Sequence, residues 1–410
     1  MSNSFATTSV VAKESLAILE NMLTFAKGVN RSWEQEFQSN MSRGYAPGQT
    51  INIKKPPRYT WRAGRVSVPQ GTTQQTVPLM LTQGGTDLSF TSAERTLSIS
   101  QMEPLLMGAM ATVANEIDRQ GLDMAINSAA HGIATPAGLG TYTLTQAQAL
   151  QFYTDAGTRL DQMAAPKDRQ RNVVMSPRLN GAMVTGLAGL FNASPQVSEQ
   201  YRTGLMVDSL GFNIAMDQNV QTHTNGTQPA GPTANAVNGA GQSGSAITVN
   251  GAAITGTITR GSKISFGGVN AVNPQSRQST GVAAQFTVTA DVAGGATSIP
   301  ISPALTPSGA FQNVTGSPAN NATLTVLGAA SSTYEGSIAY HKNAFTLAMV
   351  PLDGPPSGRG VISTAQESHK GFTMRVIEYF DPVNDVFGMR FDVLFGWAAT
   401  YPELAVVMAV

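Results

Sequence analysis

The spacing of hydrophobic residues changes several times along the chain, and each spacing predicts a different element. Between residues 10 and 29, apolar side chains recur every three or four positions, and Val11, Leu16 and Leu19 share one face. A period near 3.6 residues is typical of an amphipathic helix whose apolar face packs on a partner. The sequence therefore predicts a short helix here, followed by an extended tail.

The same helical spacing returns at 101–131. It predicts one long helix, and Gly121 is the expected place for a bend because glycine weakens a helix by about 1 kcal/mol relative to alanine. The charged residues of this stretch, Asp118 among them, fall mostly away from the apolar side.

Residues 50–100 follow a different pattern, in which apolar and other residues alternate, as in Ile51 and Ile53 or Leu79 and Leu81. Alternation with a period of two predicts strands, here in an extended ribbon divided by glycine and proline. A two-stranded ribbon is only marginally stable by itself, and its open edges can pair with other chains. We expect this ribbon to lie on a neighbouring subunit.

The rest of the chain mixes both periods, which predicts an α+β protein. The expected elements are helices at 144–163 and 177–191, and strands at 172–175, 210–216, 341–351, 372–379, 387–395 and 404–410.

Composition sets one block apart from this pattern. Residues 225–333 hold only four charged side chains, although the whole chain has 25 basic and 25 acidic residues. The block is rich in glycine, alanine, serine and threonine, and its short apolar runs are separated by turn residues, which predicts a small barrel or sandwich. Its charged residues are Arg260, Lys263, Arg277 and Asp291; its expected strands are 246–249, 254–258, 263–266, 285–289, 297–301 and 322–326, with a flexible loop at 226–244.

Overall charge and cysteine content narrow the functions further. The formal net charge is zero, so no broad basic face predicts tight nucleic-acid binding. A neutral surface favours self-association, which suits a polymerising protein. The chain has no cysteine, which excludes disulfides and thiolate metal sites. It also lacks a secretory signal pattern and an apolar run of about eighteen residues, so no membrane partner is expected.

The motifs of common enzymes do not appear in a convincing context. The four histidines are scattered without metal-ligand spacing, and Gly239, Gly241 and Gly244 match a nucleotide-binding pattern that a strand follows instead of a helix. Asp381 and Asp385 flank a turn, where turn chemistry is favoured over a cation site. We therefore expect no catalytic residue, no cofactor and no metal, and hence no enzyme.

One cluster of the ribbon combines basic and aromatic side chains. Such a cluster can contact nucleic acid, or it can mark a ribbon that lies across an acidic neighbour. We favour the neighbour, because a ribbon without its own core needs a partner surface. The predicted inter-subunit contact residues are Lys54, Lys55, Arg58, Tyr59, Trp61, Arg62 and Arg65.

The order of these elements resembles that of the major capsid proteins of tailed double-stranded-DNA bacteriophages. It is most similar to the coat proteins of short-tailed Salmonella podoviruses, which carry an inserted β-barrel domain. Four segments carry the resemblance: 260–269 (RGSKISFGGV), 285–289 (QFTVT), 343–351 (NAFTLAMVP) and 390–402 (RFDVLFGWAATYP). The resemblance implies an α+β capsid fold with an N-terminal arm, an extended β loop, a spine helix, and axial and peripheral domains.

The resemblance also implies a division of the chain into regions with separate roles. The N-terminal arm would face inward, the β loop would overlap an adjacent subunit, and the inserted barrel would aid folding and contacts between capsomers. These regions are the N-terminal arm (1–49), the extended β loop (50–100), the spine helix with part of the peripheral domain (101–141), the first part of the axial domain (142–224), the inserted β-barrel domain (225–333), and axial and peripheral strands (334–410).

By the same resemblance the function would be structural: pentamers and hexamers would assemble into an icosahedral shell around phage double-stranded DNA. The implied partners are scaffolding protein, portal protein and packaged DNA, the last without sequence specificity. The protein would reside in the virion capsid after assembly in the bacterial cytoplasm. Two alternatives remain at this point, an encapsulin-like nanocompartment shell and a surface-binding β protein. Relatives often bridge capsomers through a charged loop, but the candidate loop 226–244 has no charge, which leaves that role open.

Overall fold

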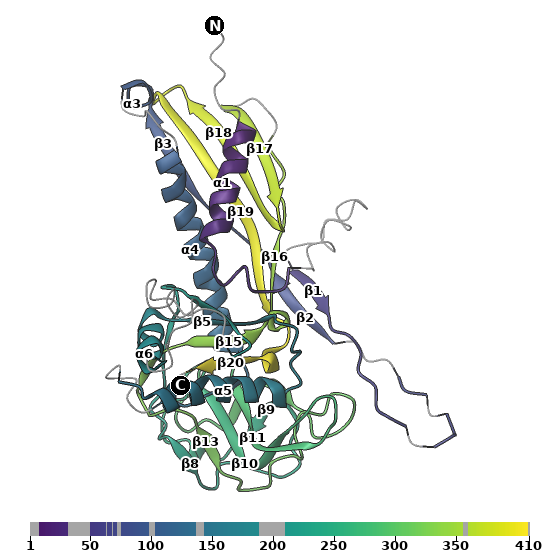
Figure 1. Cartoon of the computed structure of the whole chain (residues 1–410). Coiled ribbons are helices and arrows are strands. Elements are labelled where there is room, and N and C mark those ends of the chain that lie inside the picture. The colour runs from purple at the N-terminus through teal and green to yellow at the C-terminus, as the bar shows by residue number, and fades with distance from the viewer. Residues whose placement is uncertain are drawn as a thin grey trace, which may run out of the picture. The chain divides into compact units, whose positions relative to one another are not determined.

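The computed structural model describes residues 8–31, 50–62, 64–67, 69–71, 75–97, 103–136, 143–187, 210–355 and 360–408. Helices and strands are mixed throughout, as the α+β prediction requires (Figure 1). The chain divides into two compact units. The first contains Met1–Ile53, Val77–Gly121 and Thr346–Ala398, and the second contains Lys54–Thr76, Leu122–Phe345 and Ala399–Val410.

A five-stranded antiparallel sheet forms the centre of the first unit. Its longest strand, β19, pairs with β18 and β3, and β17 pairs with the far side of β18. The strands are β3 (Thr82–Thr91), β16 (Phe345–Met349), β17 (Val361–His369), β18 (Phe372–Asp381) and β19 (Val386–Ala399). The predicted hairpin at 372–379 and 387–395 is therefore confirmed, and it is longer than the alternation indicated.

Helix α1 (Thr8–Met22) packs on β17 and β18 through the predicted apolar face, where Val11, Leu16 and Leu19 are buried. It ends earlier than predicted because Asp118 accepts hydrogen bonds from the backbone amides of Thr24, Phe25 and Ala26, at 2.6, 3.3 and 2.9 Å. These amides follow the helix, and a carboxylate takes the place of the helical acceptors. Although Asp118 falls away from the apolar side in the sequence pattern, it is only 2% exposed.

The long helix α4 (Glu103–Ser128) contributes its residues up to Gly121 to the first unit. Gly121 serves close packing there, since an added Cβ would lie 2.5 Å from the ring of Trp397 and 2.9 Å from that of Phe25. A real Cβ does not approach other atoms so closely. The absence of a side chain at Gly121 thus lets Trp397 and Phe25 pack against α4.

The extended ribbon is shorter than predicted. Strands β1 (Thr50–Lys54) and β2 (Thr76–Met80) form a two-stranded sheet, but β3 pairs with β19 and is followed by helix α3 (Ser92–Leu97). The β19 edge binds β3 over ten register pairs, from Val386 with Thr91 to Phe395 with Thr82. The base of the ribbon also has an apolar cluster within its own unit: Ile53, Leu79, Leu81, Ala348, Val350 and Ala398.

A second five-stranded sheet organises the host part of the second unit. Its order is β4 (His131–Gly132), β20 (Ala405–Met408), β15 (Ser337–His341), β5 (Arg171–Met175) and β6 (Asn213–Met216). Helices α5 (Gln146–Gln162) and α6 (Pro177–Leu187) share an apolar core with this sheet. Helix α5 begins with a capping box in which Thr145 and Gln148 bond each other's backbone amides, a sequence-local signal for a helix start.

Several element ends differ from the predictions for local reasons. The expected strand at 341–351 is interrupted by the turn Lys342–Ala344, where His341 accepts a hydrogen bond from the amide of Asn343. Strand β6 begins late because Leu210 and Gly211 have φ values of 52° and 82°, which a strand excludes. Parts of the predicted elements at 177–191 and 404–410 lie outside the described residues.

The uncharged block is a separate antiparallel β domain inserted between strands of the host. Strand β7 (Thr222–Thr224) pairs with β14 (Thr333–Glu335), so the chain enters and leaves the domain side by side. A bridge between Val237 and Val249 brings the two ends of its sheet together. The strand order is β8 (Gly231–Thr233), β13 (Leu324–Val326), β10 (Lys263–Val272), β11 (Ser279–Val288), β12 (Ser298–Leu305) and β9 (Gly244–Thr248).

Two predictions within this domain were wrong. Residues 254–258 form no regular strand, although Ile254 and Ile258 are buried in the core and Ile258 bridges Val292. The expected flexible loop at 226–244 includes β8 and buries Gln228, Ala236 and Val237. The spacing of hydrophobic residues does not predict either segment correctly, because the buried residues of these segments enter the core one at a time and do not alternate along a strand.

Candidate assembly arm and its root

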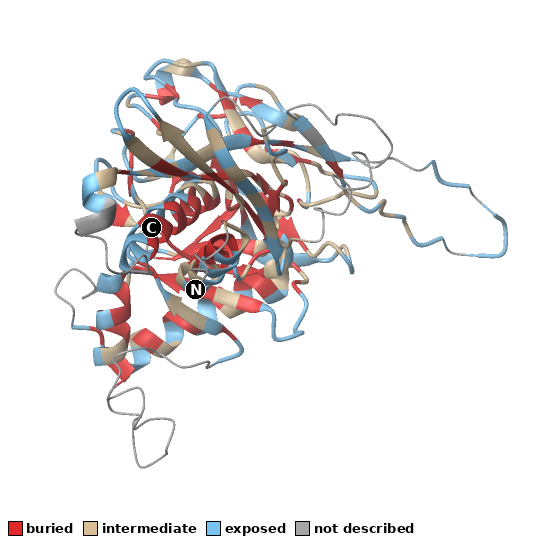
Figure 2. Cartoon of the chain, turned by 90° about the horizontal axis from the view of Figure 1, so that it is seen from above, coloured by how far each residue is buried: buried red, intermediate tan, exposed pale blue. Residues whose placement is uncertain are grey.

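The chain between β1 and β2 forms a long exposed loop, which we call the arm (residues 54–76; Figure 1). The described residues 61–71 of the arm are all exposed, and residues 54–60 are partly buried (Figure 2). Trp61 is 94% exposed and Val66 is 79% exposed. Large apolar side chains in such positions are candidates for contacts with another molecule. We call residues 54–60 the root of the arm and residues 61–71 its tip.

The tip has a defined shape despite its exposure. The side-chain amide of Gln70 spans the neck, since its Oε1 accepts from the Thr60 amide at 2.7 Å and its Nε2 donates to the Thr60 carbonyl at 2.6 Å. Arg62 donates to the carbonyls of Gly64 and Val66. The Gln70 side chain therefore takes the place of a strand residue that would pair with the backbone of Thr60. Beyond Gln70, the hydrogen bonds of Arg62 lie within the tip.

The root is held by contacts with the rest of the second unit. Arg58 Nη2 lies 3.5 Å from Glu403 Oε1, and its guanidinium lies 5.6 Å from the ring centroid of Phe311. Lys55 Nζ lies 4.9 Å from the ring centroid of Tyr401. Burial lowers the pKa of Lys55, and burial together with the nearby Glu403 carboxylate raises the pKa of Tyr401. The root is thus partly desolvated before any neighbour is present.

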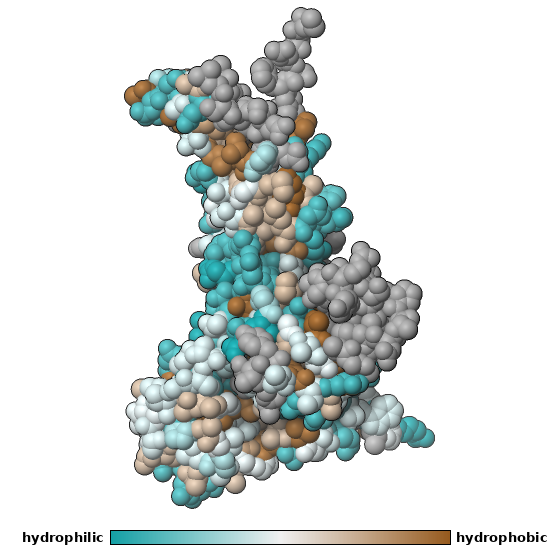
Figure 3. Space-filling model, turned by 60° about the vertical axis from the view of Figure 1, so that its left-hand side comes forward, coloured by the Kyte–Doolittle hydropathy of each residue, from teal (hydrophilic) through white to brown (hydrophobic). Residues whose placement is uncertain are grey.

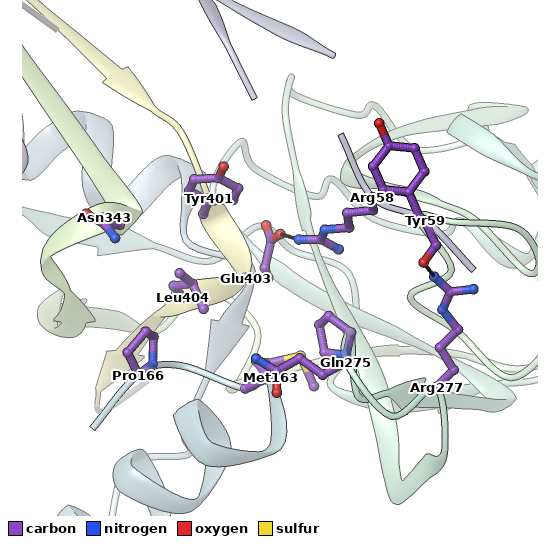
Figure 4. A pocket seen from close by; sticks show the side chains of 12 residues that line it. Arg58, Tyr59, Met163, Pro166, Gln275, Arg277, Asn343, Tyr401, Glu403 and Leu404 are labelled. Atoms are coloured by element: carbon purple, nitrogen blue, oxygen red, sulfur yellow. Dashed lines mark hydrogen bonds and ion pairs between the residues drawn. The ribbon is translucent and has the colours of Figure 1, made fainter. Parts of the chain in front are cut away.

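A hollow of about 440 Å³ lies beside the root (Figure 4). Its walls come from the root, the end of α5, the turn between β10 and β11, and the segment before β20. Figure 4 shows Arg58 reaching Glu403 across the hollow, with Arg277 at its edge bonded to Tyr59. The lining residues include Met163, Pro166, Pro274, Gln275, Asn343 and Leu404.

The seven predicted contact residues therefore have different environments. Lys55 and Arg58 contact residues of their own chain, and Arg62 shapes the tip. Lys54, Tyr59, Trp61 and Arg65 are exposed. Their contact with a neighbouring subunit stays a prediction. Sequence reasoning missed Glu403, Phe311 and Arg277, because nothing in the local pattern signals partners more than two hundred positions away.

A second site of interest is the joint between the inserted domain and the end of α4. Lys263 is fully buried, and its Nζ donates to the carbonyls of Ile126 at 2.9 Å and Ala129 at 2.6 Å, and to Thr287 Oγ1 at 3.0 Å. Three acceptors match the three hydrogens of an ammonium, and carbonyls after a helix end carry partial negative charge. Burial lowers the pKa of Lys263 to about 7.

Two histidines lie near this joint and are buried. Burial, reinforced by Arg159 and Lys263, lowers the pKa of His131 well below its ordinary value. Burial and Lys263 lower the pKa of His223 to about 4. The side chain of Gln285 bonds both the amide and the carbonyl of Gly132, at 3.0 and 3.2 Å. These histidines are packing residues of the joint, in line with the structural role predicted for them.

The turn at residues 381–385, a possible cation site in the sequence, is held by hydrogen bonds within the turn. Asp381 accepts hydrogen bonds from the Val383 amide and from Asn384 Nδ2, as turn chemistry predicts. Within the described ranges, no group of three or more acidic, histidine or cysteine residues could hold a metal ion. Across the same ranges, every helix is too short or too polar to cross a membrane.

Comparison with known proteins assigns the chain to a family. The family model described as "P22 coat protein - gene protein 5" matches residues 3–409. No curated protein matches the chain. One similar solved structure is that of Mycobacterium phage Che8, with 12% sequence identity, coverage of 94% of this chain and 90% of that chain, and a TM-score of 0.48. Another is the mature capsid of bacteriophage PhiM1, with 11% identity, coverage of 88% of this chain and 82% of that chain, and a TM-score of 0.39. A virus-like particle from Pyrococcus furiosus has 8% identity, 97% coverage of both chains and a TM-score of 0.39. Because the family match spans nearly the whole sequence, the chain belongs to the P22 coat protein family and is a structural major capsid protein, a subunit of an oligomeric phage shell.

Proposed function

We propose that the arm is the element through which each copy grips its neighbour in the shell. The observation that carries this proposal is the tip: Trp61 is 94% exposed, and the described residues around it are exposed and bonded within the arm. Exposed aromatic anchors dominate many interfaces, and a buried one typically contributes about 2 kcal/mol or more to binding. Repeated over many copies, even weak contacts of this kind stabilise a closed shell.

The rest of the proposal concerns the setting in which the arm acts. The shell would consist of pentamers and hexamers with icosahedral symmetry, formed in the bacterial cytoplasm with scaffolding protein and carrying a portal at one vertex. Packaged double-stranded DNA would be contacted without sequence specificity, which a chain of zero net charge can do through local basic side chains. The chain would act without catalysis. Family membership supports each of these points.

The regional roles follow the same reasoning. Residues 1–49 would form the N-terminal arm, and α4 would be the spine helix. Residues 142–224 and 334–410 would supply the axial and peripheral domains, and 225–333 the inserted domain. The pairing of β7 with β14 at the entry and exit of the inserted block supports the boundaries of that last region.

The test removes the exposed side chains of the tip. The triple variant Trp61→Ala, Arg65→Ala, Val66→Ala should remain folded but lose assembly with scaffolding protein, as followed by light scattering and electron microscopy. Val383→Ala is the matched control, because Val383 is 89% exposed on a different turn. Normal particles from the triple variant, at the rate of the control, would contradict the proposal.

A further inference from the structure

The inserted domain touches the arm through the turn between β10 and β11. Arg277 Nη2 donates to the carbonyl of Tyr59 at 2.8 Å and to that of Ala310 at 3.3 Å (Figure 4). Arg277 has a φ of 55°, a conformation that non-glycine residues adopt rarely and only when their surroundings hold them. One side chain thus joins the arm to a loop of the inserted domain.

The turn that presents Arg277 is itself firmly held. Asn273 Oδ1 accepts from the amides of Gln275 and Ser276 at 2.9 and 3.1 Å, and the Asn273 carbonyl accepts from the Arg277 amide at 2.8 Å. Asn273 Nδ2 also donates to the carbonyl of Gln162 at the end of α5, at 3.0 Å. The turn is therefore fixed both internally and to the host part of the second unit.

A second contact comes from the loop that Arg277 also bonds. Phe311 follows Ala310, and its ring faces the guanidinium of Arg58 in the root. Glu403 bonds the same guanidinium from the segment before β20. Arg58 is thus held between the inserted domain and the host strands.

Two of the four charged residues of the inserted domain bond backbone atoms outside that domain. Lys263 donates to the carbonyls of Ile126 and Ala129, and Arg277 donates to the carbonyl of Tyr59. In each case a basic side chain of the inserted domain donates to backbone oxygen outside that domain. Hydrogen bonds from charged donors are stronger than neutral ones. Half of the four charged residues of the block therefore serve its joints to the rest of the chain.

We infer that the inserted domain positions the assembly arm, with Arg277 as the positioning residue that fixes the root at Tyr59. This inference rests on the proposed function of the tip. An arm tied only at β1 and β2 samples many directions, and a neighbour must then order it on binding. An arm already fixed at its root avoids that entropic cost, which is how preorganisation increases affinity. The inserted domain thus acts on assembly through its own chain, apart from any contact it makes with another capsomer.

The experiment compares full-length variants in two measurements, the hydrogen exchange of arm amides in the unassembled protein and the rate of assembly with scaffolding protein. In Arg277→Ala, exchange in residues 55–62 should accelerate and assembly should slow, each about tenfold, since the loss of one charged hydrogen bond has that order of effect. Arg277→Lys should recover part of both, because an ammonium can still donate to the Tyr59 carbonyl. Arg260→Ala, which removes an exposed arginine of the same domain, should match the wild type in both.

The outcomes separate this inference from the proposed function. Arg277→Ala also removes the 3.3 Å hydrogen bond to the Ala310 carbonyl within the inserted domain, so a lower unfolding midpoint with wild-type arm exchange would show a merely structural role. If Arg277→Ala exchanges its arm amides or assembles at the wild-type rate, Arg277 does not position the arm. Loss of assembly in the triple tip variant would in that case still support the arm as the element that binds the neighbouring subunit. Normal assembly of the tip variant would instead overturn the proposed function itself.

Discussion

The arm and the inserted domain are opposites in composition and in packing. The arm, residues 54–76, has five basic residues and no acidic one, and its tip is exposed. The inserted domain has four charged residues in all, and its surface, at the bottom of the view in Figure 3, is mostly pale and of weak hydropathy. Its core, by contrast, is continuous and includes Phe266 and Phe286. If the arm contacts a neighbouring subunit as we propose, folding stability and assembly contacts are located in different parts of one chain.

This separation has a physical rationale. A region that must bind another copy has to leave apolar surface uncovered, which weakens its own fold. A region with a complete core can supply the rigidity that the first region lacks. Among the described residues, the arm and the inserted domain are joined by Arg277 on Tyr59 and by Phe311 on Arg58, and Glu403 of the host also holds Arg58.

The largest effect is expected in the core of the inserted domain. Phe286 is 1% exposed, and its ring centroid lies 5.9 Å from that of Phe266. Phe286→Ala should lower the free energy of unfolding by about 3–5 kcal/mol, because it creates a large cavity. Urea unfolding measures this, with Val282→Ala on the same strand as an exposed control. A loss below about 1 kcal/mol would contradict the view that this core supplies the stability.

A smaller effect is expected from acid, at the joint between α4 and the inserted domain. The folded pKa of His223 is about 4, whereas an unfolded histidine titrates near 6.5. Below pH 6.5, His223 is therefore protonated in the unfolded chain but stays neutral in the folded chain. The free energy of unfolding falls until about pH 4 and is constant below it. The His131 pKa is lowered in the same direction.

The variant His223→Phe isolates this contribution while keeping a ring against Tyr334, whose own ring lies 5.1 Å away. Its unfolding free energy should fall less between pH 7 and pH 4 than that of the wild type, by on the order of 2 kcal/mol. Thermal unfolding across this pH range gives the comparison. Parallel pH profiles for the two proteins would show that His223 does not titrate as its burial implies.

A weaker effect is expected at the root of the arm. Arg58→Glu places like charges beside Glu403, and should loosen the root and slow assembly. The double variant Arg58→Glu, Glu403→Arg should restore the pair, with a coupling free energy of about 0.2–1 kcal/mol. Amide exchange of the arm at low and high salt provides the measurement, because salt screens such pairs. A double variant as impaired as the sum of the two single variants would exclude the pair as a joint.

The smallest effect on stability is expected at the tip. Trp61→Ala should change the free energy of unfolding of the isolated protein by no more than about 0.5 kcal/mol, as is usual for exposed positions. Calorimetry of the unassembled protein checks this. A loss comparable to that of Phe286→Ala would mean that Trp61 packs on its own chain, and the contrast between the two regions would disappear.

The hydropathy pattern predicted elements well where one face of the element is buried along its length. The face of α1, helix α5 with its capping box, and the β18–β19 hairpin all follow from local spacing. The charge-free composition also marked a segment that forms an antiparallel sheet, which the chain enters at β7 and leaves at β14. In each of these cases the information is contained in neighbouring residues.

The pattern failed where the partner is distant in the sequence. Residues 82–91 alternate like a free ribbon, but their partner is β19, some three hundred positions away. Asp118 looks like a solvent-facing helix residue, and only the amides of Thr24, Phe25 and Ala26 explain its burial. The spacing of hydrophobic residues indicates that one face of a helix or strand is buried, but it does not identify the residues that bury it. The partners of Arg58 and Tyr59 could not be predicted from the sequence for the same reason.

If the arm binds a neighbouring copy, the tip is bare in the free subunit and covered by another copy in the shell. Acrylamide quenching of Trp61 tests it directly, as the difference between the fluorescence of the wild type and that of Trp61→Phe, which leaves Trp33 and Trp397 in place. We predict efficient quenching of the Trp61 signal in the unassembled protein and strong protection in assembled particles. Equal quenching of Trp61 in both states would contradict the account.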